Sequence, residues 1–411
     1  MRITACLVAV QILAACGGSD SAPPSPDTAP ACECAEVACT ELGATWSGGT
    51  ATCRADCGHD VSACTRVDTT SWEAVEPATR GFPEARCNDG TPFDFIVRLA
   101  ATPTKTWVIH LEGGGFCDDN GNSCAQRPLD LRSTSPQTDR ELVVATPGGV
   151  LSRTAINPLA AANHVRATYC SSDFYAGATT ERRPTLGDPA AGWYFSGHAN
   201  VAAMFAVLER DYGLDDGDAA TEVLFTGSSA GGFGVHFNAA QVTSALGGVA
   251  SRGKLRLVVD AGWMTDWDDP AHRIGAATEP DAEVWKRARA LWGATFDPAC
   301  EASNAEPSLC LYGYWYPHVA ARGPVLVQQS SIDAVFTNLH GIAPMPSPAL
   351  AEWKRSVEMS LAVVAWLFSG DVSYHVLTPS DAGMGRGPAG STLSLVLGRF
   401  WADGPPERVE F

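Results

Sequence analysis

One stretch limits the possible fold of this chain more than any other: a short apolar run that leads into a serine flanked by glycines. Residues 221–226 predict a buried strand, residues 227–231 (Gly-Ser-Ser-Ala-Gly) a sharp turn, and the residues after them the start of a helix. The glycines keep side chains out of the crowded turn, so the Ser229 hydroxyl projects at the N-terminus of that helix. Helix amides at this position can receive a developing negative charge. The stretch predicts an α/β fold with a serine placed for nucleophilic chemistry.

From about Thr70 onward the chain alternates between expected strands and expected helices. Strands are expected at residues 93–99 (near the sheet edge), 106–111, 164–169, 254–259, 324–329 and 372–377, and helices at 198–211 and 352–368. This alternation predicts a mostly parallel sheet with helices on both faces over residues 70–411. Ligands of such folds bind at the carboxyl ends of the strands.

Length and charge narrow the class of protein. The 411 residues are 45% hydrophobic, which is enough for one large core and an appendage. The formal net charge is −18 and the pI about 4.8, so nucleic acid and anionic membranes are unfavourable partners because like charges repel. A neutral polymer, a lipid ester or a small molecule fits this charge better.

The N-terminus predicts export. Arg2 precedes an apolar run over residues 3–13, which is too short to span a bilayer as a helix. Residues 13–17 (Leu-Ala-Ala-Cys-Gly) resemble the lipobox of bacterial lipoproteins, in which cleavage leaves Cys16 as a lipid-modified N-terminus. Gly17, in place of aspartate, resembles the sorting pattern for the outer membrane. We expect an exported protein that is anchored to the outer membrane or cell surface by lipid alone; a plain secretory signal is the alternative.

The cysteines agree with an oxidising compartment. Of the 14 cysteines, Cys6 leaves with the signal and Cys16 is capped, so an even number of 12 remains for disulfides. Residues 17–31, rich in Ser, Pro, Gly and Ala, predict a flexible linker.

A dense cysteine cluster follows the linker. It contains Cys32, Cys34, Cys39, Cys53, Cys57 and Cys64. So short a span cannot rest on a hydrophobic core, so we expect a module over residues 32–66 held by three disulfides, with a connectivity that the sequence leaves open. The compartment and the poor Cys-x-x-Cys spacing argue against zinc.

Ser229 requires a general base, because a serine hydroxyl is a weak nucleophile at neutral pH. Five histidines follow it: His236, His272, His318, His340 and His375. His236 would lie about two turns along the helix after the elbow and could not fold back to the serine. His375 follows the expected 352–368 helix at the edge of the last expected strand. In the α/β-hydrolase order of serine, acid and histidine, that is the place of the base, so we favour His375.

Two aspartates are candidates for the acid that orients the histidine. Asp333 directly follows the expected 324–329 strand, and Asp260 ends the strand after the elbow. Asp333 is favoured because strand, acid, helix, strand and histidine then follow one another with ordinary connection lengths. The ordinary alternative for either residue is a surface carboxylate or a helix cap.

An oxyanion hole is expected from two sources. One is the backbone N–H of Ala230, and the other is the glycine turn at residues 113–115, after the expected 106–111 strand. Glycines allow a substrate carbonyl to approach the backbone closely.

Three blocks carry a specific resemblance: residues 111–117 (Leu-Glu-Gly-Gly-Gly-Phe-Cys), 169–173 (Tyr-Cys-Ser-Ser-Asp) and 227–232 (Gly-Ser-Ser-Ala-Gly-Gly). They resemble the signature blocks of the pectin acetylesterase/Notum family, which comprises extracytoplasmic carboxylesterases with an α/β-hydrolase fold. The resemblance runs from about Thr70 to the C-terminus and excludes the cysteine-rich module.

The resemblance implies roles for particular residues. It implies a catalytic triad of Ser229, Asp333 and His375, and an oxyanion hole formed by Gly114, Gly115 and Ala230. It also implies a Cys117–Cys124 disulfide that closes a small loop beside this hole, with Cys87–Cys170 and Cys300–Cys310 as the remaining pairs.

The substrate is less constrained. Plant members of the family remove acetyl groups from pectin, while the animal member removes a fatty acyl chain from a secreted protein, and residues 264–317 share no block with either. The aromatic residues in and beside this stretch predict a sugar-stacking surface, an acyl pocket or, more commonly, the packing of a lid; they are Trp263, Trp267, Trp285, Trp292, Trp315 and Tyr316. The acidic run at 266–269 lacks the ligand spacing of a calcium loop, and we expect neither metal nor cofactor.

The sequence therefore predicts a monomeric serine carboxylesterase that hydrolyses O-acyl esters, in the first place acetyl esters on an extracellular polysaccharide, through an acyl-enzyme. The ester substrate is the expected partner. A long-chain acyl esterase of the same fold is one alternative. A catalytically silent surface-binding protein, with recognition in the cysteine-rich module, is the other.

Overall fold

The computed structural model describes residues 35–41, 46–53, 59–60, 63–66, 72–119, 124–134, 148–185, 188–277 and 279–411. The expected signal with Cys16, the expected linker, and Cys32, Cys34 and Cys57 lie outside these residues. In the described part of the chain, no helix has both the length and the apolar character needed to cross a membrane.

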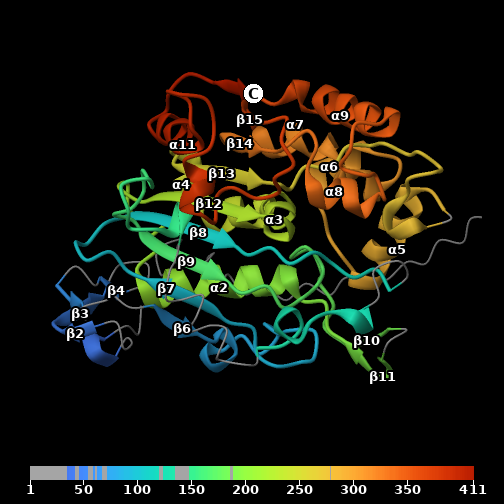
Figure 1. The fold of residues 1–411 in the computed structure, drawn as a ribbon. Helices are drawn as coiled ribbons and strands as arrows, with labels where there is room; N and C mark the ends of the chain where they lie inside the picture. The colour runs from blue at the N-terminus through green and yellow to red at the C-terminus, as the bar shows by residue number, and fades with distance from the viewer. Residues whose placement is uncertain are drawn as a thin grey trace, which may run out of the picture.

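Nine strands of the described residues form one twisted sheet at the centre of the molecule (Figure 1). From one edge to the other they are β16 (Arg408–Glu410), β15 (Trp366–Ser369), β14 (Val325–Gln328), β13 (Leu255–Asp260), β12 (Glu222–Ser228), β8 (Thr106–Leu111), β9 (Asn163–Ala167), β7 (Phe95–Arg98) and β6 (Glu73–Val75). Neighbours from β16 to β9 are parallel, and β7 pairs antiparallel with both β9 and β6. The predicted mostly parallel sheet is confirmed.

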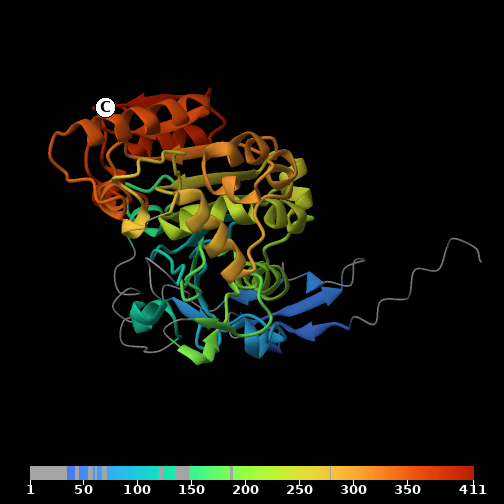
Figure 2. The ribbon, with the colours of Figure 1, turned by 90° about the vertical axis from the view of Figure 1, so that its right-hand side faces the viewer.

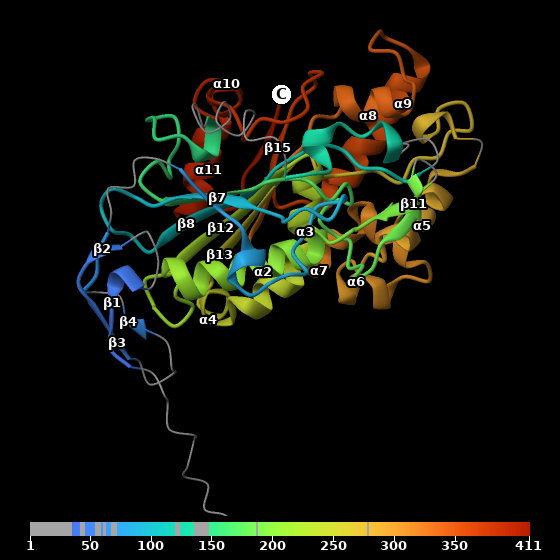
Figure 3. The same cartoon turned by 90° about the horizontal axis from the view of Figure 1, so that it is seen from below.

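Helices cover both faces of this sheet. They are α2 (Gly197–Tyr212), α3 (Ala230–Ala245), α4 (Gly247–Ser251), α5 (Asp281–Trp292), α6 (Pro298–Ser303), α7 (Tyr316–Ala320), α8 (Ala334–Leu339), α9 (Pro348–Ser360), α10 (Asp381–Met384) and α11 (Leu393–Trp401). Seen from below, α2, α3 and α4 lie on one side of the central strands and α11 on the other (Figure 3).

The pattern of β12 explains the two layers. Successive side chains of a strand point to opposite faces. Accordingly Val223 and Phe225 belong to the core that includes α2 and α3, whereas Leu224 belongs to a second core with Phe400 of α11. Both faces of the strand are buried, as parallel sheets require.

The carboxyl ends of the central parallel strands lie on the same side of the molecule, and the chain after β13 forms a cap beyond them. We use the term cap for residues 263–320, which contain α5, α6 and α7. Figures 1 and 2 show these helices, in yellow and orange, beyond the carboxyl ends of the strands. Ser229, which follows β12, lies at the carboxyl ends of these strands.

The expected C-terminal elements need correction. The helix expected at 352–368 ends earlier, as α9 (Pro348–Ser360), and Trp366–Ser369 forms strand β15 instead. No strand forms at 372–377, which is a loop. The helical pattern appeared to continue because neither Gly nor Pro separates α9 from the fully buried, apolar β15. His375 therefore lies on a loop after β15.

The cysteine-rich module lies outside the large sheet. Its described strands are β1 (Val37–Ala38), β2 (Trp46–Gly48), β3 (Thr50–Cys53), β4 (His59–Asp60) and β5 (Thr65–Arg66), which form two small sheets. A disulfide joins Cys39 to Cys64, and Cys53 is also disulfide-bonded. Cys39, Trp46 and Ala51 form only a minimal core, in keeping with stabilisation by disulfides.

Candidate active site

Ser229 occupies a sharp turn between β12 and α3. Its backbone has φ 56° and ψ −121°, a strained conformation for a residue with a Cβ. The flanking glycines are obligatory: a Cβ on Gly227 would lie 2.2 Å from the Gly231 carbonyl oxygen, and one on Gly231 2.0 Å from that of Leu111. Ala230 is the first residue of α3. The predicted strand, turn and helix are all present.

The glycine turn after β8 packs directly against this serine. A Cβ on Gly113 would lie 2.9 Å from the Ser229 Cβ and 3.5 Å from its Oγ. Gly115 has φ 71°, in the left-handed region that favours glycine. Tyr169 fixes the turn, since its hydroxyl donates to the Gly115 carbonyl (2.7 Å) and accepts from the Phe174 amide (2.8 Å).

His375 and Asp333 form a buried pair. The His375 Nδ1 lies 2.9 Å and 2.7 Å from the two carboxylate oxygens of Asp333, which is fully buried. Nδ1–H therefore donates to Asp333, which leaves Nε2 as the acceptor. Nε2 is buried and has no hydrogen-bond partner among the described residues. The imidazole is thus held in the tautomer that a general base requires.

Asp333 is held in place by its neighbours. Its Oδ1 caps α8 by accepting from the amides of Val335 (2.9 Å) and Phe336 (3.2 Å). The Gln329 side chain donates to Oδ2 (3.3 Å). A single carboxylate therefore caps α8 and also contacts the imidazole of His375.

Asp260, the rival for the acid, makes different contacts. It is fully buried at the end of β13, and its carboxylate accepts from Ser228, Leu377 and Thr378. The structure places Asp333, and not Asp260, against His375.

The four other histidines have other partners. His236 is buried in α3 and stacks on Trp315, with ring centroids 4.3 Å apart. His272 contacts Asp269, and His318 contacts Ser303. His340 lies on the carbonyl of His272, between Trp267 and Trp353. His236 is therefore a packed residue of the helix that follows the elbow.

The segment after β9 is strained and anchored beside the glycine turn. Ser172, Phe174 and Tyr175 all have positive φ values, between 53° and 58°. The Asp173 carboxylate accepts from the Tyr175 amide (3.0 Å) and from the Gly197 amide at the start of α2 (2.9 Å). Burial raises the pKa of Asp173 to about 6, although these hydrogen bonds oppose the rise. Sequence reasoning assigned no role to this aspartate, although it belongs to one of the signature blocks.

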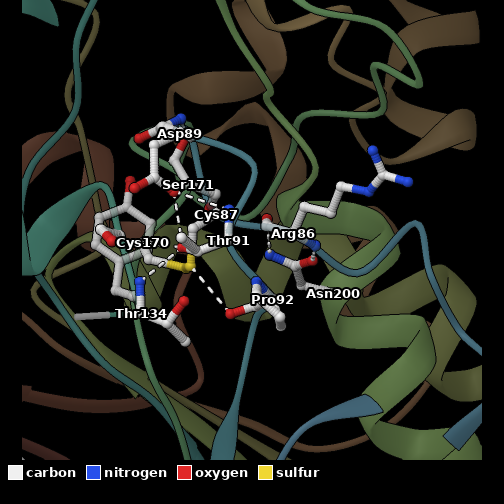
Figure 4. Close-up of a disulfide and its surroundings, with 12 residues drawn as sticks. Arg86, Cys87, Asp89, Thr91, Pro92, Thr134, Cys170, Ser171 and Asn200 are labelled. Carbon is white, nitrogen blue, oxygen red and sulfur yellow. Dashed lines mark hydrogen bonds between the residues drawn. A yellow bond between two sulfur atoms is a disulfide. The ribbon is translucent and has the colours of Figure 1, made fainter. Parts of the chain in front are cut away.

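Three disulfides have the pairing that the resemblance implied. Cys87–Cys170 joins the turn before β7 to the strained segment, beside Asp89, Thr91 and Ser171 (Figure 4). Cys117–Cys124 closes a short loop after the glycine turn, and Cys300–Cys310 lies in the cap. Disulfides of this number indicate an oxidising, extracytoplasmic compartment.

The aromatic residues of the cap are packing residues. Trp263, Trp267, Trp285, Trp292, Trp315 and Tyr316 are all at most 8% exposed. A sugar-stacking surface needs exposed ring faces, so this arrangement argues against that interpretation. One of them also contacts the loop after the glycine turn: the Trp292 Nε1 donates to the Cys117 carbonyl (2.8 Å).

The acidic run at 266–269 is engaged with protein groups. Asp266 accepts from Tyr314, Asp268 from Arg273, and Asp269 contacts His272. Within the described residues, no three His, Cys, Asp or Glu side chains form a cluster that could hold a metal ion.

This geometry can be compared with known proteins. The family model described as pectinacetylesterase matches residues 69–359. The chain belongs to the pectinacetylesterase family. Its predicted resemblance to this family is therefore confirmed.

Curated relatives lie on the Notum side of this family. The palmitoleoyl-protein carboxylesterase NOTUM of Drosophila melanogaster is 32% identical over 73% of this chain and 43% of its own length. The protein of the same name from Homo sapiens is 28% identical over 60% of this chain and 48% of its own. The chain thus spans about half the length of the curated relatives it matches, and those relatives are carboxylesterases.

A solved structure supports the fold. A crystal structure of the Wnt deacylase Notum from Drosophila matches this chain with a TM-score of 0.69 and 26% sequence identity. The match covers 81% of this chain and 93% of the solved chain. Together with the parallel sheet and the serine elbow, this likeness confirms the predicted α/β-hydrolase-like fold.

Proposed function

We propose that this chain is an exported serine carboxylesterase that hydrolyses O-acyl esters through an acyl-enzyme. The observation that carries the proposal is the conjunction of a strained, glycine-flanked Ser229 with an imidazole held by a buried carboxylate. Membership of a family of carboxylic ester hydrolases supports it.

In this mechanism His375 Nε2 removes the proton of Ser229 as Oγ attacks the ester carbonyl. The amides of Gly114, Gly115 and Ala230 stabilise the oxyanion, and the imidazolium returns the proton to the leaving alcohol. Water, deprotonated by His375, then releases the acid from the acyl-enzyme. Asp333 stays ionised and orients the imidazole throughout.

The first test is Ser229→Ala. We expect it to abolish hydrolysis of p-nitrophenyl acetate while the circular dichroism spectrum and melting temperature stay close to wild type. A fluorophosphonate probe should label wild type at Ser229, as located by peptide mass spectrometry, and should not label the variant. Persistent activity in the variant contradicts the assignment, and an inert, unlabelled wild type favours a silent binding protein.

The acyl group is proposed to be acetyl, carried by an extracellular polysaccharide, in line with the description of the family model. Long-chain deacylation is the second candidate, because the curated relatives are palmitoleoyl-protein carboxylesterases. A series of p-nitrophenyl esters from acetyl to palmitoyl separates the two. A kcat/KM that falls steadily with chain length supports acetyl, and one that rises supports the long chain.

We also propose lipid anchoring through Cys16. In a bacterial expression host, Cys16→Ser should move the protein from the membrane fraction to the soluble fraction, and metabolic labelling with an alkynyl fatty acid should be lost with it. Equal fractionation of the two proteins contradicts the anchor.

A further inference from the structure

Asp260 is a second buried carboxylate at the carboxyl ends of the central strands, which we call the catalytic edge, and the proposed mechanism does not use it. It is the last residue of β13, opposite Ser228 of β12 in the parallel register, and it is fully buried. An ionised carboxylate in such a place requires several donors. The identity of those donors suggests its role.

One set of contacts reaches the serine. The Ser228 hydroxyl donates to the Asp260 Oδ2 (2.9 Å), and the Ser229 amide donates to the Asp260 carbonyl (2.8 Å). Asp260 thus binds Ser228 through its side chain and Ser229 through its backbone.

A second set reaches the loop that carries His375. The Leu377 amide donates to the Asp260 carboxylate (3.1 Å to Oδ2), as do the Thr378 amide (2.8 Å) and the Thr378 hydroxyl (2.7 Å). The hydroxyls of Thr378 and Ser228 lie 2.8 Å apart, so they also contact each other directly. Burial raises the pKa of the Asp260 carboxyl, and these donors oppose the rise.

The His375 loop needs such an anchor, because residues 371–377 belong to no helix or strand. Asp333 holds the imidazole from one side, through Nδ1. From another side, Asp260 accepts from the backbone amides of Leu377 and Thr378, two and three residues after the histidine. The Asp260 contact joins this loop to the elbow, which the contacts of Asp333 do not.

We propose that Asp260 is a positioning residue, which fixes the distance between Ser229 Oγ and His375 Nε2 by binding the elbow and the histidine loop at the same time. It takes no part in proton transfer. The proposal rests on the proposed esterase function. Displacements of about 1 Å at a reacting pair can cost about 100-fold in rate, so the effect is measurable.

The central variant is Asp260→Asn. It keeps the shape but removes the negative charge and replaces one of the two acceptor oxygens with an NH₂ group. In one orientation this group faces the Leu377 amide, and in the other it faces the donors of Ser228 and Thr378. We expect kcat for p-nitrophenyl acetate to fall about 10- to 100-fold, with KM within about twofold, measured on the full chain at least 20 °C below its melting temperature. Labelling by the fluorophosphonate should slow by the same factor, because it also depends on the serine and histidine.

A matched control distinguishes positioning from general stability. Asp216 is another aspartate that accepts two backbone amides, those of Gly248 and Val249 at the start of α4. Asp216→Asn should lower the melting temperature and leave kcat unchanged. A kcat for Asp260→Asn that also stays at the wild-type value would overturn the proposal.

Milder variants decide the matter if Asp260→Asn does not fold. Thr378→Val and Ser228→Ala each remove one hydroxyl that contacts Asp260. Each should lower kcat about 3- to 10-fold with little change in KM, at about 1 kcal/mol per hydrogen bond. The double variant should lose less than the product of the two, because both hydroxyls act through one carboxylate. Independent, multiplying losses, or none, contradict a shared anchor.

Failure of the proposal is distinguishable from failure of the function. If wild type neither hydrolyses esters nor labels at Ser229, the function itself is wrong. If wild type does both while Asp260→Asn and Thr378→Val keep their kcat, positioning alone is wrong. If Asp260→Asn abolishes turnover and Asp333→Asn retains it, Asp260 is the acid of the triad, and the positioning role is overturned.

Discussion

The catalytic edge of the sheet and the cap are held together by different forces. At the edge, fully buried Asp333 and Asp260 bind loops and helix ends through short hydrogen bonds, and Ser229 keeps a strained φ of 56°. Such contacts are directional, so they fix atoms relative to one another.

The cap contains a disulfide and ion pairs, but its large side chains are held by apolar packing. Several of its tryptophans pack edge to face, for example Trp263 against Trp315 at 5.3 Å and Trp267 against Trp353 at 5.3 Å. Packing of this kind contributes free energy of folding with little demand on exact geometry. The difference indicates that substitutions at the edge should act on rate and substitutions in the cap on stability.

The largest effect is expected from Asp333→Asn. Its amide cannot accept from His375 Nδ1–H in the way the carboxylate does, so the imidazole loses the tautomer that leaves Nε2 free. We expect kcat to fall about 10⁴-fold, the order seen when a triad carboxylate becomes an amide. The melting temperature should change far less, because the Asn oxygen can still cap α8. A variant that melts much earlier than wild type but keeps its kcat would contradict the comparison.

Gly113→Ala should come next. The new Cβ would lie 2.8 Å from the Ser228 carbonyl oxygen and 2.9 Å from the Ser229 Cβ, so the glycine turn must move away from the serine. Misplaced oxyanion donors typically cost about 100- to 1,000-fold in kcat. Gly247→Ala, where a Cβ would meet nothing within 4 Å, is the control and should keep wild-type kinetics. Similar rates for the two variants would show that the turn is not rigid.

In the cap, Asp281→Asn should change how stability depends on pH. Burial raises the pKa of Asp281 to about 6, so its protonated form stabilises the fold below pH 4 and this contribution is lost as pH rises through 6. Relative to wild type, the variant should therefore gain about 3 kcal/mol in unfolding free energy between pH 4 and pH 8, at about 1.4 kcal/mol per pKa unit. Urea unfolding at both pH values measures this, and kcat should stay within about threefold.

Asp269→Asn serves as a counterpart of opposite sign. The Ala271 amide and His272 hold the pKa of Asp269 below its usual range, so its contribution is present at neutral pH and lost on acidification. This variant should be less stable than wild type at pH 8 and approach it in acid. The same pH trend in both variants would contradict the burial argument for Asp281.

The sequence predicted the catalytic edge better than the cap for a physical reason. Neighbouring backbone atoms lie so close to Gly227, Gly113 and Gly231 that only glycine is acceptable there. The residue types in the sequence therefore mark the position of the turn and of the serine. Strands β8, β12 and β13 were also predictable, because both of their faces are buried and each contains a run of apolar residues.

Other features leave no such trace. No Gly or Pro separates helix α9 from strand β15, so the apolar pattern before Trp366 does not show where the helix ends and the strand begins. Asp333 and Asp260 both follow parallel strands, and only the fold shows which one faces His375. For the cap tryptophans the sequence favoured packing but left ligand binding open, since burial depends on contacts between distant segments.

The smallest effect is expected where the two regions meet, at Trp292. Its Nε1 donates to the Cys117 carbonyl, in the loop after the glycine turn. Trp292→Phe removes this bond and should cost about 1 kcal/mol, seen as a three- to fivefold lower kcat. Trp315→Phe is the matched control, because the Trp315 Nε1 has no partner among the described residues and its ring stacks on His236. Both variants lose ring contacts and should melt earlier, but only Trp292→Phe should slow turnover. If Trp315→Phe lowers kcat equally, the packing of the cap sets the geometry of the catalytic edge, and the comparison between the two regions is wrong.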